Sequence, residues 1–350
     1  MSILSRARAQ IRDLQPYSSA RMEASGGSVM LNANESPWAG AGLNRYPDPQ
    51  PATLVARLAE LYSAAPQQVL VGRGSDEAID LLVRAFCEAR SDAIVVCPPT
   101  FAMYGVCARI QGAEVIEAPL TAQFELDVDA VLATAAPHVK LVFLCTPNNP
   151  TGGLVPLPAI ERIARALAQR ALVVVDEAYI EFADAPSAVT LLPKHGNLAV
   201  LRTLSKAYAL ASARVGALIA AAEVIDLLRR IQAPYPLPAP SVAAALAALE
   251  PDARPQVAAA VARTVAAREQ MRRDLRRLDA VRQVLPSRAN FLCAQFTDCG
   301  DVYRYLLRRG VVVRDVSRYP GLADHLRISI GTPEENRRLL EMLRAHEGAS

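Results

Sequence analysis

The chain has 350 residues, of which 52% are hydrophobic, and a formal net charge of +3. This length and apolar content suffice for one or two buried cores, while the small charge and the lack of a basic patch interleaved with aromatics argue against nucleic-acid binding. No apolar run approaches the roughly 20 residues of a membrane span, and no export signal follows Met1, so we expect a cytoplasmic protein without a membrane partner.

Cysteines and lysines narrow the possible chemistry. The six cysteines include no Cys-x-x-Cys pair and no histidine at a metal-binding spacing, so buried thiols are favoured over a metal site or disulfides. Of the 38 basic residues, the lysines are Lys140, Lys194 and Lys206. A GC-rich genome would produce the same bias, but a lysine that is kept can be one whose amine is needed, because arginine cannot form a Schiff base.

From about residue 50 to 235, short apolar runs alternate with amphipathic helical stretches. Helical patterns are clearest at 76–89 and 157–170. Continuous Val, Ile and Leu runs between helices are typical of a sheet buried on both faces, so we predict an α/β fold with a mostly parallel sheet. The expected strands are 69–71, 93–97, 139–145, 172–175, 198–202 and 215–220.

A proline-rich segment, 234–240, cannot continue a helix and is expected to connect two domains. Beyond it, residues 242–278 have a helical pattern, and a smaller α+β region follows with strand-like runs at 290–294, 311–313 and 326–330. We therefore predict a large domain over residues 36–235 and a small domain over residues 236–350. The first 35 residues have no strong core pattern and are expected to pack on the small domain.

Polar residues follow several predicted strands, at the carboxyl ends where open parallel sheets bind ligands. After 69–71 comes a glycine turn that opens onto a helix, where backbone N–H groups and the helix dipole could hold a phosphate. An ordinary strand-to-helix turn would look the same. The residues of interest at these strand ends are Gly74, Ser75, Asp76, Asn149, Asp176, Tyr179, Thr203, Ser205, Lys206 and Arg214.

Each of these residues also has a plain structural explanation, since Asp176 could cap a helix, Tyr179 could lie in the core and Lys206 could be a solvated surface lysine. The combination, however, matches what pyridoxal 5'-phosphate requires. Asp176 suits a protonated pyridine nitrogen, and Lys206 suits the aldehyde. Asn149 and Tyr179 can donate to the phenolic oxygen. The phosphate would be held by Ser75, Asp76, Thr203, Ser205 and Arg214.

At these motifs the chain resembles the fold-type I aminotransferases. The resemblance lies in residues 149–152 (Asn-Pro-Thr-Gly), in residues 176–179 (Asp-Glu-Ala-Tyr), and in Ser205 and Lys206 followed by Arg214. More narrowly, the chain looks like the histidinol-phosphate aminotransferase family, from about Tyr17 to Asn336. The segments that carry this likeness are 31–37, 45–48, 72–77, 98–104 and 326–336.

The resemblance implies a fold-type I enzyme in which Lys206 forms a Schiff base with pyridoxal phosphate, Asp176 meets the pyridine nitrogen and Tyr104 stacks on the ring. It also implies a homodimer with shared sites, in which Tyr46 reaches the cofactor phosphate of the partner subunit. The large domain would then be the cofactor-binding one. Lys206 would move a proton at the substrate as base and acid, in a ping-pong cycle.

The resemblance further implies that Tyr17, Asn34, Arg314 and Arg327 line the substrate site. The expected reaction is amino transfer between histidinol phosphate and 2-oxoglutarate, with glutamate as the other product, in histidine biosynthesis. Two guanidiniums suit either a phosphate or a carboxylate, although one of them could instead form a surface ion pair. The family usually has Gly-Leu before the cofactor arginine, where this chain has Ser-Ala at 212–213.

Three other interpretations stay open at this point. An aromatic amino-acid aminotransferase or a threonine-phosphate decarboxylase on the same scaffold would have much of this pattern. A non-catalytic regulator that joins such a domain to a DNA-binding head would need a long N-terminal extension, whereas here the family pattern begins near Tyr17. An assay with the competing substrates separates the first two from histidinol-phosphate transamination.

Overall fold

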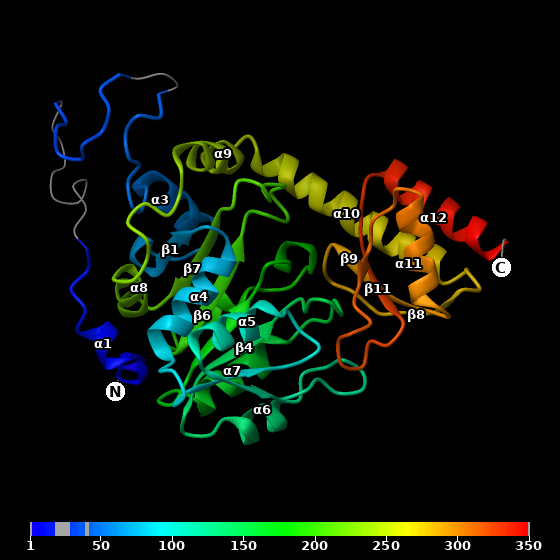
Figure 1. Cartoon of the computed structure of the whole chain (residues 1–350), viewed down its shortest axis with the longest axis horizontal. Coiled ribbons are helices and arrows are strands. Elements are labelled where there is room, and N and C mark those ends of the chain that lie inside the picture. The colour runs from blue at the N-terminus through cyan, green and yellow to red at the C-terminus, as the bar shows by residue number, and fades with distance from the viewer. Residues whose placement is uncertain (1, 18–28, 39–41, 349–350) are drawn as a thin grey trace.

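The structure is a computed structural model that describes residues 2–17, 29–38 and 42–348. Two sheets lie in separate domains, joined by a long helix (Figure 1). The larger sheet has the strand order β1-β7-β6-β5-β4-β2-β3, and the smaller has the order β10-β11-β9-β8. No helix among the described residues is both long enough and apolar enough to cross a membrane.

The large sheet is mostly parallel. Strands β2 to β6 run in the same direction, while β7 is antiparallel to both of its neighbours, β6 and β1. This confirms the predicted α/β fold. The strands are β1 (Val69–Gly72), β2 (Ala93–Val96), β3 (Glu114–Glu117), β4 (Val139–Cys145), β5 (Leu172–Asp176), β6 (Leu198–Thr203) and β7 (Gly216–Ala220). The edge strand β3 was not predicted, because it is short and its end residues are exposed glutamates.

Helices bury both faces of this sheet, because successive side chains of a strand point to opposite sides. In β5, Val173 and Val175 join one core while Leu172 and Val174 join the other. The first core is covered by α3 (Ala52–Leu61), α6 (Val128–Thr134), α7 (Leu157–Ala166) and α9 (Ala239–Leu249). The second is covered by α4 (Ser75–Phe86), α5 (Met103–Gln111) and α8 (Ala222–Arg229).

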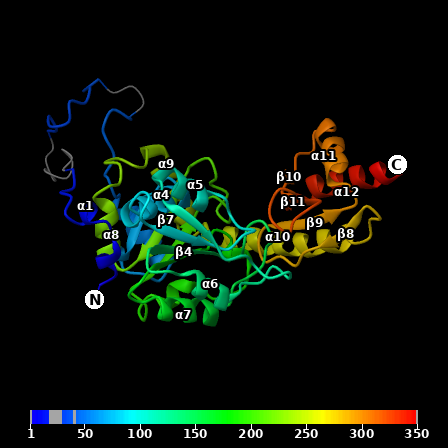
Figure 2. The same cartoon turned by 60° about the horizontal axis from the view of Figure 1, so that its bottom comes forward.

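The N-terminus packs on the large domain. Here η1 (Ile3–Arg6) and α1 (Ala9–Arg12) lie beside α4 and α8, with Ile3 and Ala7 buried in the second core. Arg8 forms an ion pair with Glu88 at 3.0 Å. The expectation that the N-terminal segment packs on the small domain is therefore wrong for residues 2–14. Between α1 and α3, residues 29–38 lie apart from both domains (Figures 1 and 2), whereas Tyr46 stacks on Tyr235 and Gln50 hydrogen-bonds to the backbone of Val71.

The chain leaves the large domain later than predicted. We expected the small domain to begin at residue 236, but Ala245 and Leu249 of α9 share a core with α3. The crossing is made by α10 (Arg254–Leu275), whose Val265 packs near η3 (Ile180–Phe182) and whose Met271 lies in the small-domain core. Figure 2 shows α10 extending from one domain to the other.

The small domain packs α10, α11 (Cys299–Arg308) and α12 (Pro333–Glu347) on its sheet. The sheet contains β8 (Val281–Val284), β9 (Phe291–Phe296), β10 (Arg314–Asp315) and β11 (His325–Ser329). Strands near 290–294 and 326–330 are confirmed, whereas 311–313 is not a strand. Pairing starts only at Arg314, whose partner in β11 is Arg327.

Candidate active site

A cavity of about 100 Å³ lies where the carboxyl ends of β4, β5 and β6 meet the start of α4. Nine of the twelve residues predicted to bind the cofactor line it, and they come from segments spread between residues 75 and 214. The lining consists of Ser75, Asp76, Phe101, Cys145, Asn149, Asp176, Ala178, Tyr179, Thr203, Ser205, Lys206 and Arg214. The parallel topology therefore gathers these side chains at one edge of the sheet, as expected.

One end of the cavity is built to accept an anion. Gly74 has a φ of +81°, and a Cβ there would lie 2.7 Å from Nη2 of Arg214. A Cβ on Gly216 would lie 2.6 Å from the backbone nitrogen of Ser75. The two glycines thus let the turn, the arginine and β7 approach closely. Because α4 begins at Ser75, the N–H groups of its first turn have no partner within the helix and are available to an anion.

The side chains around Arg214 are already hydrogen-bonded to one another. Nη2 of Arg214 lies 3.1 Å from Oδ2 of Asp76, and Nη1 lies 3.5 Å from Oγ of Ser205. The hydroxyls of Thr203 and Ser205 are 3.0 Å apart. A bound phosphate would have a guanidinium and two hydroxyls within reach, which is the donor set that phosphate oxygens require.

Asp176 forms the buried floor of the cavity. Its Oδ1 accepts a hydrogen bond from the backbone N–H of Ala178 at 3.1 Å, and its Oδ2 accepts one from the hydroxyl of Tyr104 at 2.7 Å. Burial raises the pKa of this carboxyl to about 6, while the two hydrogen bonds oppose that rise. A carboxylate held in this way can accept a proton-bearing nitrogen.

The small domain contacts the cavity residues Asn149 and Tyr179. Nδ2 of Asn149 donates to the Tyr179 hydroxyl at 3.2 Å, and Arg327 of the small domain donates to Oδ1 of Asn149. The Arg327 guanidinium also lies 5.4 Å from the ring centroid of Phe291, which in turn meets the ring of Tyr179 edge-on. The amide and phenol that were predicted to meet one ligand oxygen are therefore adjacent.

Lys206 lies at the mouth of this cavity, with its Nζ 5.5 Å from the ring centroid of Tyr179. The residue is exposed to solvent, although it is one of those that line the cavity. Partial desolvation, and then the guanidinium of Arg327, lower the pKa of the Lys206 amine below its usual value. A larger fraction of this amine is therefore neutral and nucleophilic near neutral pH than for a surface lysine.

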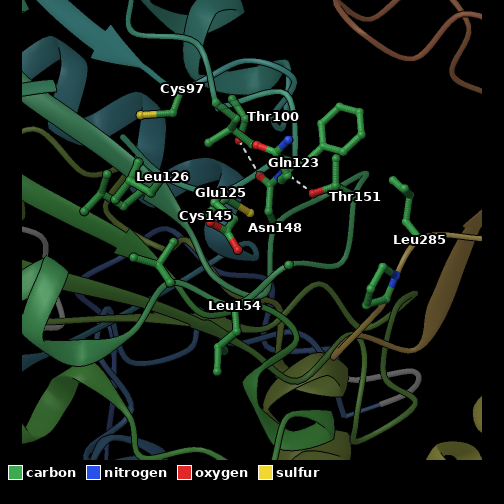
Figure 3. Close-up of a pocket in the computed structure, with 16 residues that line it drawn as sticks. Cys97, Thr100, Gln123, Glu125, Leu126, Cys145, Asn148, Thr151, Leu154 and Leu285 are labelled. Atoms are coloured by element: carbon green, nitrogen blue, oxygen red, sulfur yellow. Dashed lines mark hydrogen bonds between the residues drawn. The ribbon is translucent and has the colours of Figure 1, made fainter. Parts of the chain in front are cut away.

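The loop that carries Asn149 is anchored by its neighbour Asn148, which sequence reasoning missed. Figure 3 shows Asn148 in an adjacent cavity of about 180 Å³, hydrogen-bonded to Thr100 and Thr151. Its Oδ1 accepts from Thr100 at 2.9 Å, and its Nδ2 donates to Thr151 at 2.8 Å and to the carbonyl of Pro99 at 2.8 Å. These bonds tie the loop that carries Asn149 to the loop that carries Phe101.

The predicted ring-stacking role of Tyr104 is not what the structure shows. Tyr104 is fully buried behind the cavity, where its ring stacks on Phe143 with centroids 4.7 Å apart and its hydroxyl meets Asp176. Phe101, three residues earlier, lines the cavity instead. The sequence 98–104 contains both aromatics, and only the position of α5, which begins at Met103, decides which of them faces the ligand.

Four other predicted residues are not among those that line the cavity. Tyr17 lines a separate cavity beside α8, Asn34 is exposed, and Tyr46 stacks on Tyr235 with centroids 4.6 Å apart. Arg314 is exposed on β10 directly opposite Arg327. Directly paired residues of antiparallel strands point to the same face, so the two arginines share one face of the small sheet.

Comparison with known proteins agrees with this geometry. The family model of aminotransferase class I and II matches residues 28–343. A histidinol-phosphate aminotransferase from Xanthomonas axonopodis pv. citri is 52% identical, over 100% of this chain and 99% of its own length. The protein of the same name from Stenotrophomonas maltophilia is also 52% identical, over 99% and 98% of the two chains.

Solved structures are similar as well. A putative histidinol-phosphate aminotransferase from Erwinia carotovora atroseptica has a TM-score of 0.80 at 27% identity, over 88% of this chain and 89% of that one. The histidinol-phosphate aminotransferase of Sinorhizobium meliloti, in complex with pyridoxal-5'-phosphate, has a TM-score of 0.76 at 27% identity. The match covers 87% of this chain and 85% of that one. With a family model matched over most of its length and a site of the expected composition, this chain belongs to the class I and II aminotransferases.

Proposed function

We propose that this chain is a histidinol-phosphate aminotransferase that uses pyridoxal 5'-phosphate and exchanges an amino group between histidinol phosphate and 2-oxoglutarate. The proposed substrate is inferred from a pair of arginines. Arg327 is hydrogen-bonded to Asn149 at the cavity, and Arg314 lies beside Arg327 on the same face of the small sheet. Each substrate of this reaction is anionic, and guanidiniums bind phosphate and carboxylate oxygens in pairs. The relatives that share half of the sequence carry the same name.

The cavity fits the cofactor group by group. Asp176 would meet the pyridine nitrogen, Phe101 would lie against the ring, Asn149 and Tyr179 would donate to the phenolic oxygen, and Lys206 would hold the aldehyde carbon. The turn at Gly74 and Ser75, with Arg214, would hold the phosphate. When bound, the cofactor supplies an electron-withdrawing ring that stabilises negative charge at the substrate carbon.

The chain's own residues would perform the proton movements. The Lys206 amine, whose pKa is lowered, can take a proton from the α-carbon of the substrate and return it as an acid. Arg327 and Arg314 would orient the anionic end of the substrate so that this α-carbon faces Lys206. Because the same pair binds the second substrate, one site would serve both halves of a ping-pong cycle.

The proposal includes a homodimer with shared sites. Residues 29–38, between α1 and α3, lie apart from their own chain's domains and expose large apolar side chains, among them Leu31 at 90% and Trp38 at 88% exposure. Exposed apolar clusters of this kind mark binding surfaces. A second copy of the chain is the occupant we propose, with Tyr46 reaching the partner's phosphate site. A reducing compartment such as the cytoplasm suits the six buried free cysteines.

A direct assay tests the proposed reaction. Purified protein reconstituted with pyridoxal phosphate is given histidinol phosphate, phenylalanine or threonine phosphate, each with 2-oxoglutarate, and glutamate and carbon dioxide are measured. We expect glutamate to form fastest with histidinol phosphate and no carbon dioxide to be released. Equal rates with phenylalanine would favour an aromatic aminotransferase, and carbon dioxide from threonine phosphate would favour the decarboxylase.

A further inference from the structure

We infer that Tyr104 is a positioning residue for Asp176, and that its hydroxyl keeps the proton shared between this carboxylate and the cofactor on the pyridine nitrogen. The inference rests on the proposed use of pyridoxal phosphate. It replaces the ring-stacking role expected from the sequence with a different one, exerted through Asp176 from behind the cavity.

The geometry leaves the Tyr104 hydroxyl little freedom. The side chain has no exposed surface, and its ring lies parallel to that of Phe143 within 10°, with centroids 4.7 Å apart. The ring of Phe101 meets it edge-on at 5.6 Å. Because α5, β4 and the loop before α5 together fix the phenol ring, its oxygen stays 2.7 Å from Oδ2 of Asp176. The same stack connects Tyr104 to Phe101, which lines the cofactor cavity.

The carboxylate depends on this donor because so few groups stabilise its charge. Oδ1 has the N–H of Ala178, and Oδ2 has the hydroxyl of Tyr104. Of the other titratable groups that face Asp176, Lys206 favours the ionised form and Asp76 opposes it, with the neutral thiol of Cys145 beside them. Burial is the largest influence and raises the pKa of Asp176 to about 6. Loss of the Tyr104 hydroxyl would raise it further.

This balance decides where a shared proton lies. A buried carboxylate that accepts a second hydrogen bond is a weaker base than one that does not, because the bond stabilises its charged form. With the Tyr104 hydroxyl present, the carboxylate is the weaker base of the pair and the proton remains on the pyridine nitrogen. Without the hydroxyl, the proton would move to Asp176, and the ring would lose the positive charge that lets it withdraw electrons.

The test is Tyr104→Phe, which keeps the stacked ring and removes only the oxygen. Wild type and variant are loaded with pyridoxal phosphate carrying ¹⁵N in the ring, and the nitrogen signal is followed by NMR between pH 6 and pH 9. We expect the variant's signal to move toward that of an unprotonated pyridine. We also expect kcat to fall about ten- to a hundredfold, as for a lost hydrogen bond to a charged group, with little change in the KM of histidinol phosphate.

Tyr62→Phe is a matched control. Tyr62 is also a buried phenol of the large domain, but its oxygen has no hydrogen-bond partner among the described residues. In the Tyr62→Phe variant, the signal of the cofactor's ring nitrogen and the value of kcat should match those of wild type. An unchanged nitrogen signal in Tyr104→Phe would overturn the inference, whether or not activity falls, because a merely structural role would not move the proton. A wild-type protein that binds no pyridoxal phosphate would instead overturn the proposed function and this inference with it.

Discussion

Arg327 of the small domain donates a hydrogen bond to the side-chain oxygen of Asn149 in the large domain. Asn149 in turn donates through its nitrogen to the hydroxyl of Tyr179. The amide is therefore held with its oxygen toward the small domain and its nitrogen toward the cavity. One contact thus connects the sheet face that carries Arg327 and Arg314 to the group expected to meet the cofactor's phenolic oxygen.

Lys206 should be the residue that holds the cofactor. Borohydride reduction of the loaded protein, followed by peptide mapping, should place the cofactor on Lys206. Lys206→Ala should still bind cofactor through the other groups of the cavity but lose nearly all turnover. Lys140, which pairs with Asp92 at 3.4 Å, and the exposed Lys194 are the controls, and their alanine variants should keep activity. An adduct on either control lysine would contradict the assignment.

Asp176 should make the cofactor-free protein less stable as the pH rises. Its pKa is about 6 in the folded protein and near 4 when unfolded, so folding favours the protonated form. The stabilisation is complete below about pH 4 and is lost as the pH rises through 6, which amounts to roughly 3 kcal/mol in all and about 1 kcal/mol between pH 5 and pH 8. Asp176→Asn removes this titration.

Melting curves of the apo forms at pH 5 and pH 8 measure this effect. Asp176→Asn should gain stability relative to wild type on going from pH 5 to pH 8. A difference between the two proteins that stays the same at both values of pH would show that Asp176 does not titrate in this range.

Gly216→Ala should weaken cofactor binding without unfolding the protein. The new Cβ would lie within 2.6 Å of backbone atoms of Gly74 and Ser75, so the phosphate turn must move. Such overpacking costs about 1–3 kcal/mol, or roughly five- to a hundredfold in the dissociation constant of pyridoxal phosphate. Gly196→Ala is the control, because a Cβ there meets nothing within 4 Å. Equilibrium dialysis measures the affinity of each variant for pyridoxal phosphate. Equal affinities of Gly216→Ala and Gly196→Ala would argue against a phosphate site at this turn.

Mixing two defective chains should restore activity if sites are shared. Lys206→Ala alone should be inactive, and Tyr46→Phe alone should be weakened about tenfold by loss of a hydrogen bond to a charged phosphate. In a mixed dimer, one site would combine Lys206 from one chain with Tyr46 from the other. Excess Lys206→Ala chain should therefore raise the activity per Tyr46→Phe chain severalfold. Strictly additive rates after subunit exchange, or full activity of a monomer on sedimentation, would contradict a shared site.

Much of the scaffold was predictable because it depends on local patterns. Apolar runs of four to seven residues gave the central strands, and topology alone then placed Asn149, Asp176 and Lys206 together. The errors came where packing between distant segments decides. Phe101 and Tyr104 have the same local pattern, yet α5 turns one toward the cavity and the other into the core.

The N-terminal segment shows the same limit. Ile3 and Ala7 are too sparse to form a pattern, but they fill a gap between α4 and α8 that no sequence window contains. The proline-rich segment 234–240 was predicted to connect the domains, but α9 already begins at Ala239 and packs on α3 through Ala245 and Leu249, so this prediction was wrong. The alanine-rich sequence of α9 has no distinct apolar face from which its packing on α3 could be predicted.

Alanine variants of Arg314 and Arg327 should distinguish an effect on substrate binding from an effect on cofactor orientation. Arg314 has no described contact with Asn149, so Arg314→Ala should raise the KM of histidinol phosphate and leave the cofactor spectrum unchanged. Arg327→Ala removes the bond to Asn149 together with the proposed substrate contact, so it should alter the spectrum as well and lower kcat/KM in both half-reactions. The loss of a charge-assisted pair costs about 2–4 kcal/mol, or roughly thirty- to a thousandfold.

Arg327→Lys distinguishes charge from geometry at this position. A lysine keeps the positive charge and can still donate to Asn149, but it cannot form the paired hydrogen bonds of a guanidinium. We therefore expect the cofactor spectrum to recover while kcat/KM for histidinol phosphate stays well below wild type. Arg318→Ala, an exposed arginine between β10 and β11, is the control and should behave as wild type. Dephosphorylated histidinol should be a very poor substrate of the unmutated enzyme, because it offers the arginines no anion. Comparable kcat/KM for histidinol and histidinol phosphate would show that the pair does not bind the phosphate.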